Sequence, residues 1–397
     1  MGIVVTGIGV VSALGPNPAA FRRALKDGVN ACALHDFTRF DGSVVRAPAY
    51  MAVPAEPEGL IEPRKLRRLF RLARMSAVAA RQALKHAELD PSTLDPTRLG
   101  VCFGTGFGAM EPTQKFVDSW LDNGEASASP LQFMNSVHGI MASQIALDIN
   151  AQGVNLTVAQ RDICFEGALD SAVQLLEARR ADVILVGAGD ELTPMLHEFA
   201  CRTLTSTTDP ANWSVDTWGA SSAVIPGDGA AVAVLERREN AGTRRRSLAR
   251  VLATDVGRHD NGGADVALRA WEVAGEPTID LITNARDGGA RSKKLYDARE
   301  TKLAKDLGDA LAVSHRGNFG NYPSAGAQQF VANVLMLHQC ESYWPLAKGE
   351  RRFAGHMSSP RTILHDAAST SGNHAAYVIA RGTKNFSSES DQSAGSP

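Results

Sequence analysis

Short apolar segments recur along the whole chain, with helical stretches between them. Each segment is only a few residues long and is apolar throughout, as expected of a strand that is buried on both faces of a sheet. These segments are 3–5, 100–103, 183–186, 230–235, 248–254, 281–283 and 375–379. Strands and helices that alternate in this way predict a layered α/β fold.

The clearest helical stretch covers residues 63–86 and begins with Pro63, which suits the first turn of a helix. Its apolar side chains recur at steps of three and four residues and form one stripe. They are Leu66, Leu69, Phe70, Ala73, Ala77, Ala80 and Leu84. The same stretch carries the basic residues Arg64, Lys65, Arg67, Arg68, Arg71 and Arg74. A solvated helix face explains them, and the alternative is a docking patch for an acidic partner.

Composition excludes several classes of protein. The net charge is −2, so the chain has no general attraction for nucleic acid or for an anionic membrane. No apolar run is long enough to span a bilayer, and the start lacks the pattern of a secretion signal, so we expect a cytoplasmic protein. The five cysteines form no Cys-x-x-Cys pair, which argues against a zinc knuckle and a disulfide framework. We therefore expect no metal and no cofactor.

A polar seam at 237–246 divides the chain of 397 residues. Each side of the seam begins with an apolar segment, so we predict two similar halves, 1–240 and 247–383. The tail, 384–397, is rich in serine and is predicted to be disordered.

Two local motifs have structural explanations that require no ligand. The segment 104–108, Gly-Thr-Gly-Phe-Gly, follows a strand but lacks the Gly-x-Gly-x-x-Gly spacing of a dinucleotide site, so a tight turn explains it better. His138 stands before an apolar helix without a second histidine at i+4, so a metal site is not supported.

Several motifs, taken in order, resemble the β-ketoacyl-acyl carrier protein synthases, which have the thiolase fold. The opening Val4-Val5-Thr6-Gly7-Ile8-Gly9 resembles the first strand and turn of that family. Later landmarks are Gly104-Thr105-Gly106, Asn135-Ser136-Val137-His138, Ala181-Asp182-Val183-Ile184-Leu185-Val186-Gly187, Pro226-Gly227-Asp228-Gly229-Ala230 and Gly372-Asn373-His374-Ala375. The resemblance spans residues 2–381 and implies an αβαβα arrangement of two similar halves.

The family's chemistry uses a cysteine at a helix N-terminus, two histidines and a lysine. Counting forward from Gly153 and back from Ala181 both place Asp162 at the nucleophile position. A carboxylate there cannot form the thioester that this chemistry requires. Cys164 imitates the family's Cys-x-x-Gly with Gly167 and is the alternative nucleophile.

The other catalytic residues of the family are also replaced in this sequence. Arg286 stands where the first histidine is expected, Arg316 where the lysine is expected, and Asn321 where the second histidine is expected. Residues 367–372 replace the glycine- and phenylalanine-rich gating loop. Packing landmarks without catalytic groups are typical of a subunit kept for its shape.

The resemblance therefore implies a chain-length factor, the inactive ketosynthase-like subunit of a type II polyketide synthase. Its expected partners are a catalytic ketosynthase, paired through residues near 154–159, an acyl carrier protein and the growing polyketide chain. The candidate residues for the tunnel or interface are Phe107, Met110, Phe116, Phe133, Met134 and His138. The Ser136-Val137-His138 segment resembles the branch that makes reduced polyene chains.

Two alternatives stay open at this point. One is a divergent condensing enzyme that uses Cys164, with Asp162 or His138 as a helper. The other is a thiolase-fold scaffold unrelated to polyketides.

Overall fold

The computed structural model describes residues 2–39, 41–54, 59–203, 224–241, 247–258, 263–308, 310–343, 359–369 and 371–382. The predicted disordered tail, 384–397, lies outside the described residues. In the part of the chain that is described, no helix combines the length and apolar character needed to cross a membrane.

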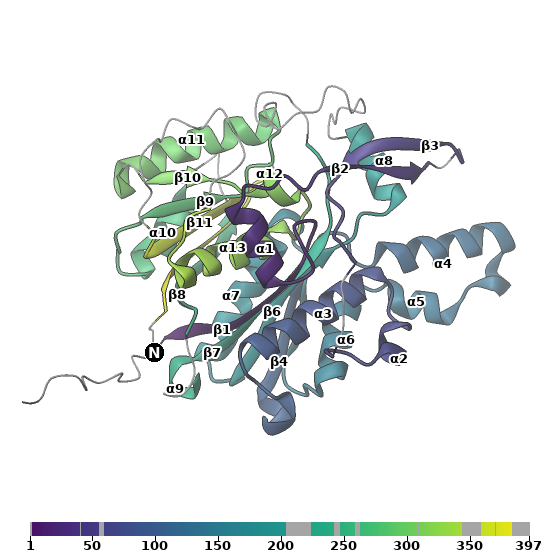
Figure 1. Cartoon of the computed structure of the whole chain (residues 1–397), viewed down its shortest axis with the longest axis horizontal. Helices are drawn as coiled ribbons and strands as arrows, with labels where there is room; N and C mark the ends of the chain where they lie inside the picture. The colour runs from purple at the N-terminus through teal and green to yellow at the C-terminus, as the bar shows by residue number, and fades with distance from the viewer. Residues whose placement is uncertain are drawn as a thin grey trace, which may run out of the picture.

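A ten-stranded sheet forms the centre of the molecule, in the order β10-β9-β11-β12-β8-β1-β7-β6-β4-β5 (Figure 1). The first set of strands is β1 (Ile3–Val11), β4 (Leu99–Gly104), β5 (Asn155–Val158), β6 (Val183–Asp190) and β7 (Gly229–Arg237). The second set is β8 (Ala249–Arg258), β9 (Leu281–Asn284), β10 (Leu311–Val313), β11 (Thr362–Ala368) and β12 (Asn373–Arg381). A separate hairpin consists of β2 (Ala33–Thr38) and β3 (Val44–Ala49).

The two sets of strands repeat one topology. Numbered within its own set, each runs in the order 3-2-4-5-1. The first three strands in this order are parallel, and strand 5 pairs antiparallel with both of its neighbours. The sets meet where β1 pairs with β8, antiparallel, from Ile3 opposite Val251 to Val5 opposite Ala249. This repeat confirms the predicted fold of two similar halves. The boundaries 1–240 and 247–383 themselves stay a prediction.

Helices complete five layers. Helices α7 (Cys164–Glu177) and α13 (Ala325–Gln339) lie between the two halves of the sheet, in one core with side chains of β1, β6, β8, β11 and β12. Helices α3 (Arg71–His86) and α6 (Ile140–Ile149) cover the outer face of the first half. Helices α10 (Asp265–Val273) and α11 (Ala290–Leu307) pack on the second half. The order α–β–α–β–α matches the prediction.

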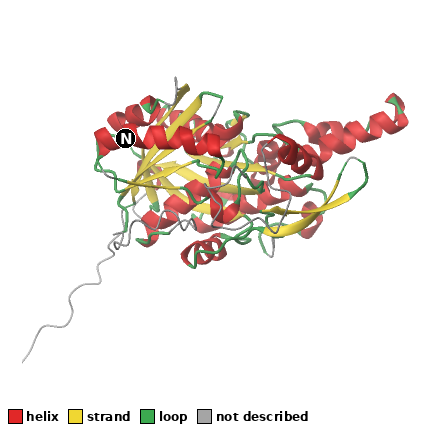
Figure 2. Cartoon of the chain, turned by 90° about the horizontal axis from the view of Figure 1, so that it is seen from above, coloured by secondary structure: helices red, strands yellow, loops and turns green. Residues whose placement is uncertain are grey.

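The remaining helices are shorter or lie at the periphery. They are α1 (Pro18–Lys26), α2 (Pro63–Leu66), α4 (Met110–Asn123), α5 (Pro130–Ser136), α8 (Pro194–Thr203), α9 (Arg238–Ala241) and α12 (Arg316–Phe319). Helices α4 and α5 extend away from the body of the molecule (Figure 1), and Figure 2 shows the same projection from above.

The predicted single helix over 63–86 is wrong in one respect, because the chain forms α2, then a break, then α3. At the break, two carboxylates accept hydrogen bonds from the first amides of α3. Glu111 accepts from the amide of Arg71 at 3.2 Å, and Glu191 accepts from the amide of Leu72 at 3.2 Å. Side chains from distant elements thus fix a helix start that the local sequence does not mark.

The glycines of the opening motif have a packing role. A Cβ on Gly7 would come within 2.1 Å of the carbonyl oxygen of Ala83, and one on Gly9 within 1.9 Å of that of Ala79. Helix α3 therefore lies directly against the backbone of β1, and only glycine permits this approach.

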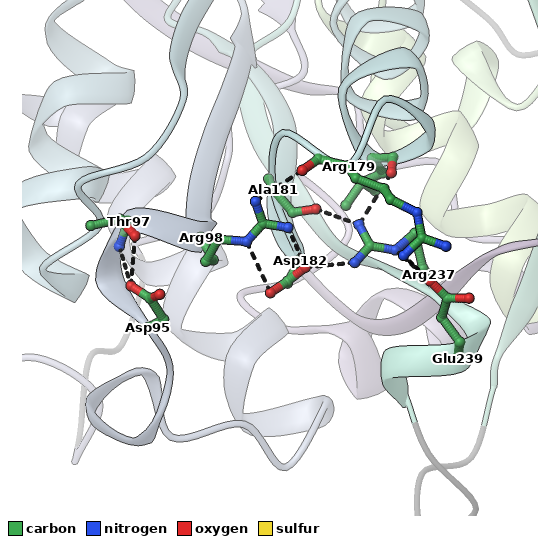
Figure 3. Close-up of polar contacts among 9 residues, drawn as sticks. Asp95, Thr97, Arg98, Arg179, Ala181, Asp182, Arg237 and Glu239 are labelled. Carbon is green, nitrogen blue, oxygen red and sulfur yellow. Dashed lines mark hydrogen bonds and ion pairs between the residues drawn. The ribbon is translucent and has the colours of Figure 1, made fainter.

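The Ala181-Asp182 landmark is also structural (Figure 3). Arg98 donates to both carboxylate oxygens of Asp182, at 3.1 and 2.7 Å, and Arg237 donates to Oδ1 at 2.6 Å. Arg237 also donates to the carbonyl oxygen of Ala181 at 2.6 Å. This cluster joins the start of β4, the start of β6 and the end of β7.

Candidate functional site

A cavity of about 260 Å³ opens where the two halves meet. Its polar walls come from the turn before α7, from the end of β6 and from the segments around α12 and β11 of the second half. Its apolar walls come largely from α8 and from Phe107. The residues that line the cavity include Phe107, Asp162, Asp190, Glu191, Leu192, Leu196, Phe199, Asp287, Leu295, Arg316, Asn321, Tyr322 and Ser369.

Asp162 lies in the 3-10 turn Arg161–Ile163 that leads directly into α7. Its carboxylate is open to the cavity and makes no hydrogen bond to any described residue. Desolvation by the surrounding protein raises the pKa of Asp162. The positive charge of Arg316 lowers this pKa, whereas the negative charges of Asp287 and Glu166 raise it further. The structure thus brings this predicted residue to the cavity at the tip of the central helix.

Arg316 and Asn321 face the same cavity. Arg316 is 4% exposed, and its Nη1 donates a hydrogen bond to Oδ1 of Asn321. The Nε and Nη2 atoms of Arg316 have no hydrogen-bond partner among the described residues, and neither does the hydroxyl of Tyr322. Buried donors without partners are rare in folded proteins. The cavity therefore contains unused hydrogen-bonding capacity.

Arg286 is not brought to the cavity. Its guanidinium binds α11, with Nη2 at 2.9 Å from an oxygen of Asp297 and 2.8 Å from one of Glu300. The neighbours Ala285 and Asp287 line the cavity in its place. The residue at the expected position of the first histidine therefore binds a helix and is outside the described lining of the cavity.

Cys164 is the first residue of α7 and is fully buried. Its backbone carbonyl packs against Gly104, where a Cβ would come within 2.4 Å of the oxygen. Burial raises the pKa of the Cys164 thiol well above its usual value, and the charges of Asp190, Glu166 and Asp162 add to this. The thiol is outside the described lining of the cavity. A buried neutral thiol is a poor nucleophile.

The Gly104-Thr105-Gly106 turn binds a side chain of its own protein. Oδ1 of Asp190 accepts from the amides of Gly106 and Phe107, at 3.0 Å each, and from Oγ1 of Thr105 at 2.9 Å. The amide of Ser324 in the second half donates to Oδ2 at 3.0 Å. The turn predicted from sequence is present, and its amides are occupied by Asp190.

Sequence reasoning missed Glu191. Its carboxylate accepts from the amide of Leu72 at the start of α3 and, at 2.8 Å, from the amide of Glu111 at the start of α4. Burial raises the pKa of Glu191 to about 7, although both amides favour the charged form. One carboxyl thus joins two helices beside the cavity. No local signal marks it, because both of its partners are distant in sequence.

The six predicted tunnel or interface residues separate into two groups. Phe107 lines the cavity, and Met110 packs beside it against the cluster around β2, β3 and α8. Phe133 and Met134 are 57% and 60% exposed on the projecting α5. Phe116 packs on Phe133, with ring centroids 5.6 Å apart. His138 is exposed, and its ring lies against Gly108.

The basic residues of 63–74 differ in their exposure to solvent. Arg64, Lys65, Arg67, Arg68 and Arg74 are exposed. Arg71 instead binds the buried carboxylate of Asp228 and donates to the carbonyl oxygen of Ala52 at 3.1 Å. A solvated face was thus the wrong interpretation for Arg71. Lys65 and Arg68 border a groove of about 350 Å³ between α2, α3, α5 and α6.

Within the described ranges, no group of three or more histidine, cysteine, aspartate or glutamate side chains is arranged to hold a metal ion.

Comparisons with known proteins agree with this fold. The family described as beta-ketoacyl synthase, N-terminal domain, matches residues 1–241. The granaticin polyketide putative beta-ketoacyl synthase 1 of Streptomyces violaceoruber is 30% identical over 367 residues, which cover 84% of this chain and 85% of that protein. The 3-oxoacyl-[acyl-carrier-protein] synthase 2 of Coxiella burnetii is 25% identical over 363 residues, which cover 84% of this chain and 85% of that protein.

Solved structures share the fold. The ishigamide ketosynthase/chain length factor has a TM-score of 0.80 at 20% identity and matches 96% of this chain and 99% of that one. The complex AntDE:AntF, a type II polyketide acyl-carrier protein with its ketosynthase bound to the hexaketide, has a TM-score of 0.82 at 17% identity, with the same coverage. The chain therefore has the thiolase-like ketosynthase fold and belongs to the β-ketoacyl synthase family.

Proposed function

We propose that this chain is a chain-length factor: a non-catalytic subunit that pairs with a catalytic ketosynthase and closes the acyl tunnel of a type II polyketide synthase. The observation that carries the proposal is the replacement of the attacking group. A carboxylate, Asp162, occupies the tip of α7 in the cavity, while the nearest thiol, Cys164, is buried and held in its neutral form.

The other replaced groups support the same function. Arg286, at the expected position of the first histidine, is charged at every relevant pH, so it cannot act as the neutral donor and acceptor that an imidazole provides. Arg286 is engaged with Asp297 and Glu300 on α11. Among the described residues that line the cavity, none is a cysteine, a histidine or a lysine, which supports a role in binding.

A surface for the partner is available on the first half. Strand β5 is the last strand of the sheet, so one of its edges pairs with no strand in the described part of the chain. Near it, α4, α5 and α6 expose large apolar side chains, which is unusual for a monomer's surface. These are Val117, Trp120, Leu121, Leu131, Phe133, Met134 and Leu147, together with Val137 directly after α5. We propose that β5 and these side chains contact the ketosynthase, as the neighbour described as a ketosynthase/chain length factor suggests.

An acyl carrier protein is the second proposed partner, and the exposed basic residues Arg64, Lys65, Arg67 and Arg68 are the proposed contact. A solved neighbour is a complex of a ketosynthase with its carrier protein. For the product, we retain the reduced polyene chain, on the resemblance of Ser136-Val137-His138.

Production of the chain alone, of the partner ketosynthase alone and of both together tests the proposal. We expect elongation of malonyl units only when both are present, and we expect Cys164→Ala to leave that activity unchanged. Condensation by this chain alone, abolished by Cys164→Ala, would establish the divergent enzyme instead. Iodoacetamide provides an independent readout, because the buried Cys164 thiol should react only after unfolding in urea.

The pairing surface has its own test. Leu131→Asp and Met134→Asp place a charge in the proposed interface and should prevent co-purification with the ketosynthase. Val273→Asp is the matched control, since Val273 is 74% exposed but lies on α10, against the other half of the sheet. Equal co-purification of all three variants would contradict the proposed interface.

A further inference from the structure

Helices α4 and α5 form an arm, residues 110–136, that projects from the body of the molecule (Figures 1 and 2). All residues of the arm are described, and Pro112 is the only buried one. The two helices pack on each other, with the rings of Phe116 and Phe133 in contact. A segment that buries so little has low local stability. The bonds at the base of the arm therefore decide how firmly it is held.

One carboxylate from the body holds this base. Glu191, directly after β6, accepts hydrogen bonds from the amide of Glu111 at 2.8 Å and from the amide of Leu72 at 3.2 Å. Neither α3 nor α4 has a hydrogen bond from an N-cap side chain of its own. Glu111 in turn accepts from the amide of Arg71 at 3.2 Å. Glu191 is therefore a shared cap that joins the arm to α3.

This joint contains more carboxylates than cations. Arg71 pairs with the buried Asp228, and Lys115 pairs with Glu111 at 2.5 Å. Glu191 is 3% exposed and forms no ion pair with any described residue. When ionised, it lies against the like charge of Glu111 without an ion-pair partner of its own.

Other charged groups near the joint act elsewhere. On the elements that meet here, the remaining titratable side chains are Asp190 on β6, His197 and Glu198 on α8 and, on the other walls of the cavity, Arg161, Asp162, Asp287 and Arg316. Desolvation raises the pKa of Asp162, and both of these arginines oppose that rise. Burial likewise raises the pKa of Glu191, to about 7, and the charge of Glu111 adds to this, whereas Arg71 and the two amides oppose it.

We propose that Glu191 controls a hinge: in its neutral form the base of the arm stays closed against α3, and its ionisation favours an open arm. A neutral carboxyl protonated at Oε2 still accepts the shorter bond, from the amide of Glu111, through Oε1. The ionised group is repelled by Glu111 and gains hydration when the base opens. The closed arm thus binds the proton more tightly than the open arm, so raising the pH favours opening.

The arm carries exposed apolar side chains of the proposed pairing surface, among them Trp120, Leu131 and Met134. Ionisation of Glu191 therefore regulates how that surface is presented. This consequence rests on the proposed function, whereas the motion of the arm is a property of the chain alone.

Hydrogen–deuterium exchange of the purified full chain at pH 6 and pH 8 tests the hinge, with rates corrected for the intrinsic pH dependence of exchange. We expect peptides of α4 to lose about threefold to tenfold in protection at the higher pH. The upper value applies if opening returns the pKa of Glu191 from about 7 to its ordinary 4.5. Faster exchange in α4 than in α10 at both pH values identifies local opening.

Three variants assign the effect. Glu191→Gln keeps a carbonyl acceptor but cannot ionise, so its α4 protection should be equal at the two pH values. Asp118→Asn is the matched control, because it removes an exposed carboxylate of α4 and should keep the wild-type response. Glu111→Gln removes the facing charge and should reduce the response, and it decides the matter if Glu191→Gln does not fold.

Four results would overturn the inference: wild-type protection that is constant or rises with pH, exchange in α4 no faster than in α10, an undiminished response in both glutamine variants, or loss of the response in Asp118→Asn. Co-purification with the ketosynthase is measured separately. Pairing together with a pH-independent arm overturns only the inference, and a pH-dependent arm without pairing overturns only the proposed function.

Discussion

The second half of the molecule contains a fully buried charge cluster that makes a strong prediction about stability. Arg299 on α11 and Asp366 on β11 are buried, and Nε of Arg299 donates to Oδ2 of Asp366 at 2.8 Å. Nε2 of His374 on β12 lies 2.8 Å from Oδ1 of Asp366, and Arg299 also donates to the carbonyl oxygen of Gly263. Burial by itself raises the pKa of Asp366, but Arg299 and His374 together hold it well below its usual range.

Arg299→Met removes the cation and keeps much of the side-chain volume. The change leaves the buried carboxylate of Asp366 without its ion-pair partner, and breaking such a pair from one side costs about 3–5 kcal/mol. That is a large part of the total stability of a typical protein, about 5–15 kcal/mol. Adding Asp366→Asn removes the unpaired charge, so the double variant should regain about 2 kcal/mol relative to Arg299→Met alone.

Urea unfolding followed by circular dichroism measures these differences in the free energy of unfolding. Arg269→Met is the matched control, because Arg269 is 52% exposed and its pair with Asp255 should contribute less than about 1 kcal/mol. A loss below about 1 kcal/mol for Arg299→Met, or a double variant no more stable than the single one, would refute the reasoning.

Three further predictions concern stability. Gly9→Ala should lower the free energy of unfolding by about 3 kcal/mol or more in urea unfolding, because its Cβ would come within 1.9 Å of a backbone carbonyl of α3; a loss under about 1 kcal/mol would contradict the packing argument. Hydrogen bonds from Arg98 lower the pKa of Asp182 to about 2, so its stabilising contribution, at most about 1 kcal/mol for a carboxylate this exposed, is present above about pH 4 and is lost as pH falls through about 2. The deficit of Asp182→Asn relative to wild type should therefore shrink between these pH values in thermal melts, and a constant deficit would disprove it. Burial raises the pKa of Glu191 to about 7, so the folded state retains this proton more tightly than the unfolded state, and stability falls as pH rises from about 4.5 through 7. Glu191→Gln should remove that part of the pH dependence of the unfolding midpoint, and an unchanged pH profile would contradict it.

The sequence by itself determined where seven of the strands lie, and the family resemblance supplied the order of the layers. All seven apolar segments lie in β1, β4, β6, β7, β8, β9 and β12, apart from Leu248, which directly precedes β8. Such segments are predictable because a strand buried on both faces must be apolar over its own few residues. The glycines at 7 and 9 were readable as a motif for a related reason, since a close backbone approach tolerates no side chain.

Spacing from the landmarks of the family resemblance predicted one site with Asp162, Arg286, Arg316 and Asn321. All of these except Arg286 line one cavity. The sequence did not predict whether the side chains of Phe133 and Met134 are buried within the chain or exposed to solvent. An apolar side chain on an amphipathic helix fits a tunnel, a core or an interface equally well, and only the projection of α4 and α5 shows that a single chain leaves them exposed.

The tertiary structure alone decided which charges meet. Arg64 and Arg71 are alike in sequence context, yet Arg64 is exposed and Arg71 binds Asp228, 157 residues away. Arg286 binds Glu300 on α11 instead of lining the cavity, and Glu191 accepts hydrogen bonds from the first amides of α3 and α4. Arg299 binds Asp366, which lies 67 residues later in the chain. Electrostatic pairing depends on distances of a few ångströms between segments far apart in the chain. The local pattern of apolar residues predicts which side chains are buried. It does not predict which charged side chains lie close together, because that depends on how the layers pack.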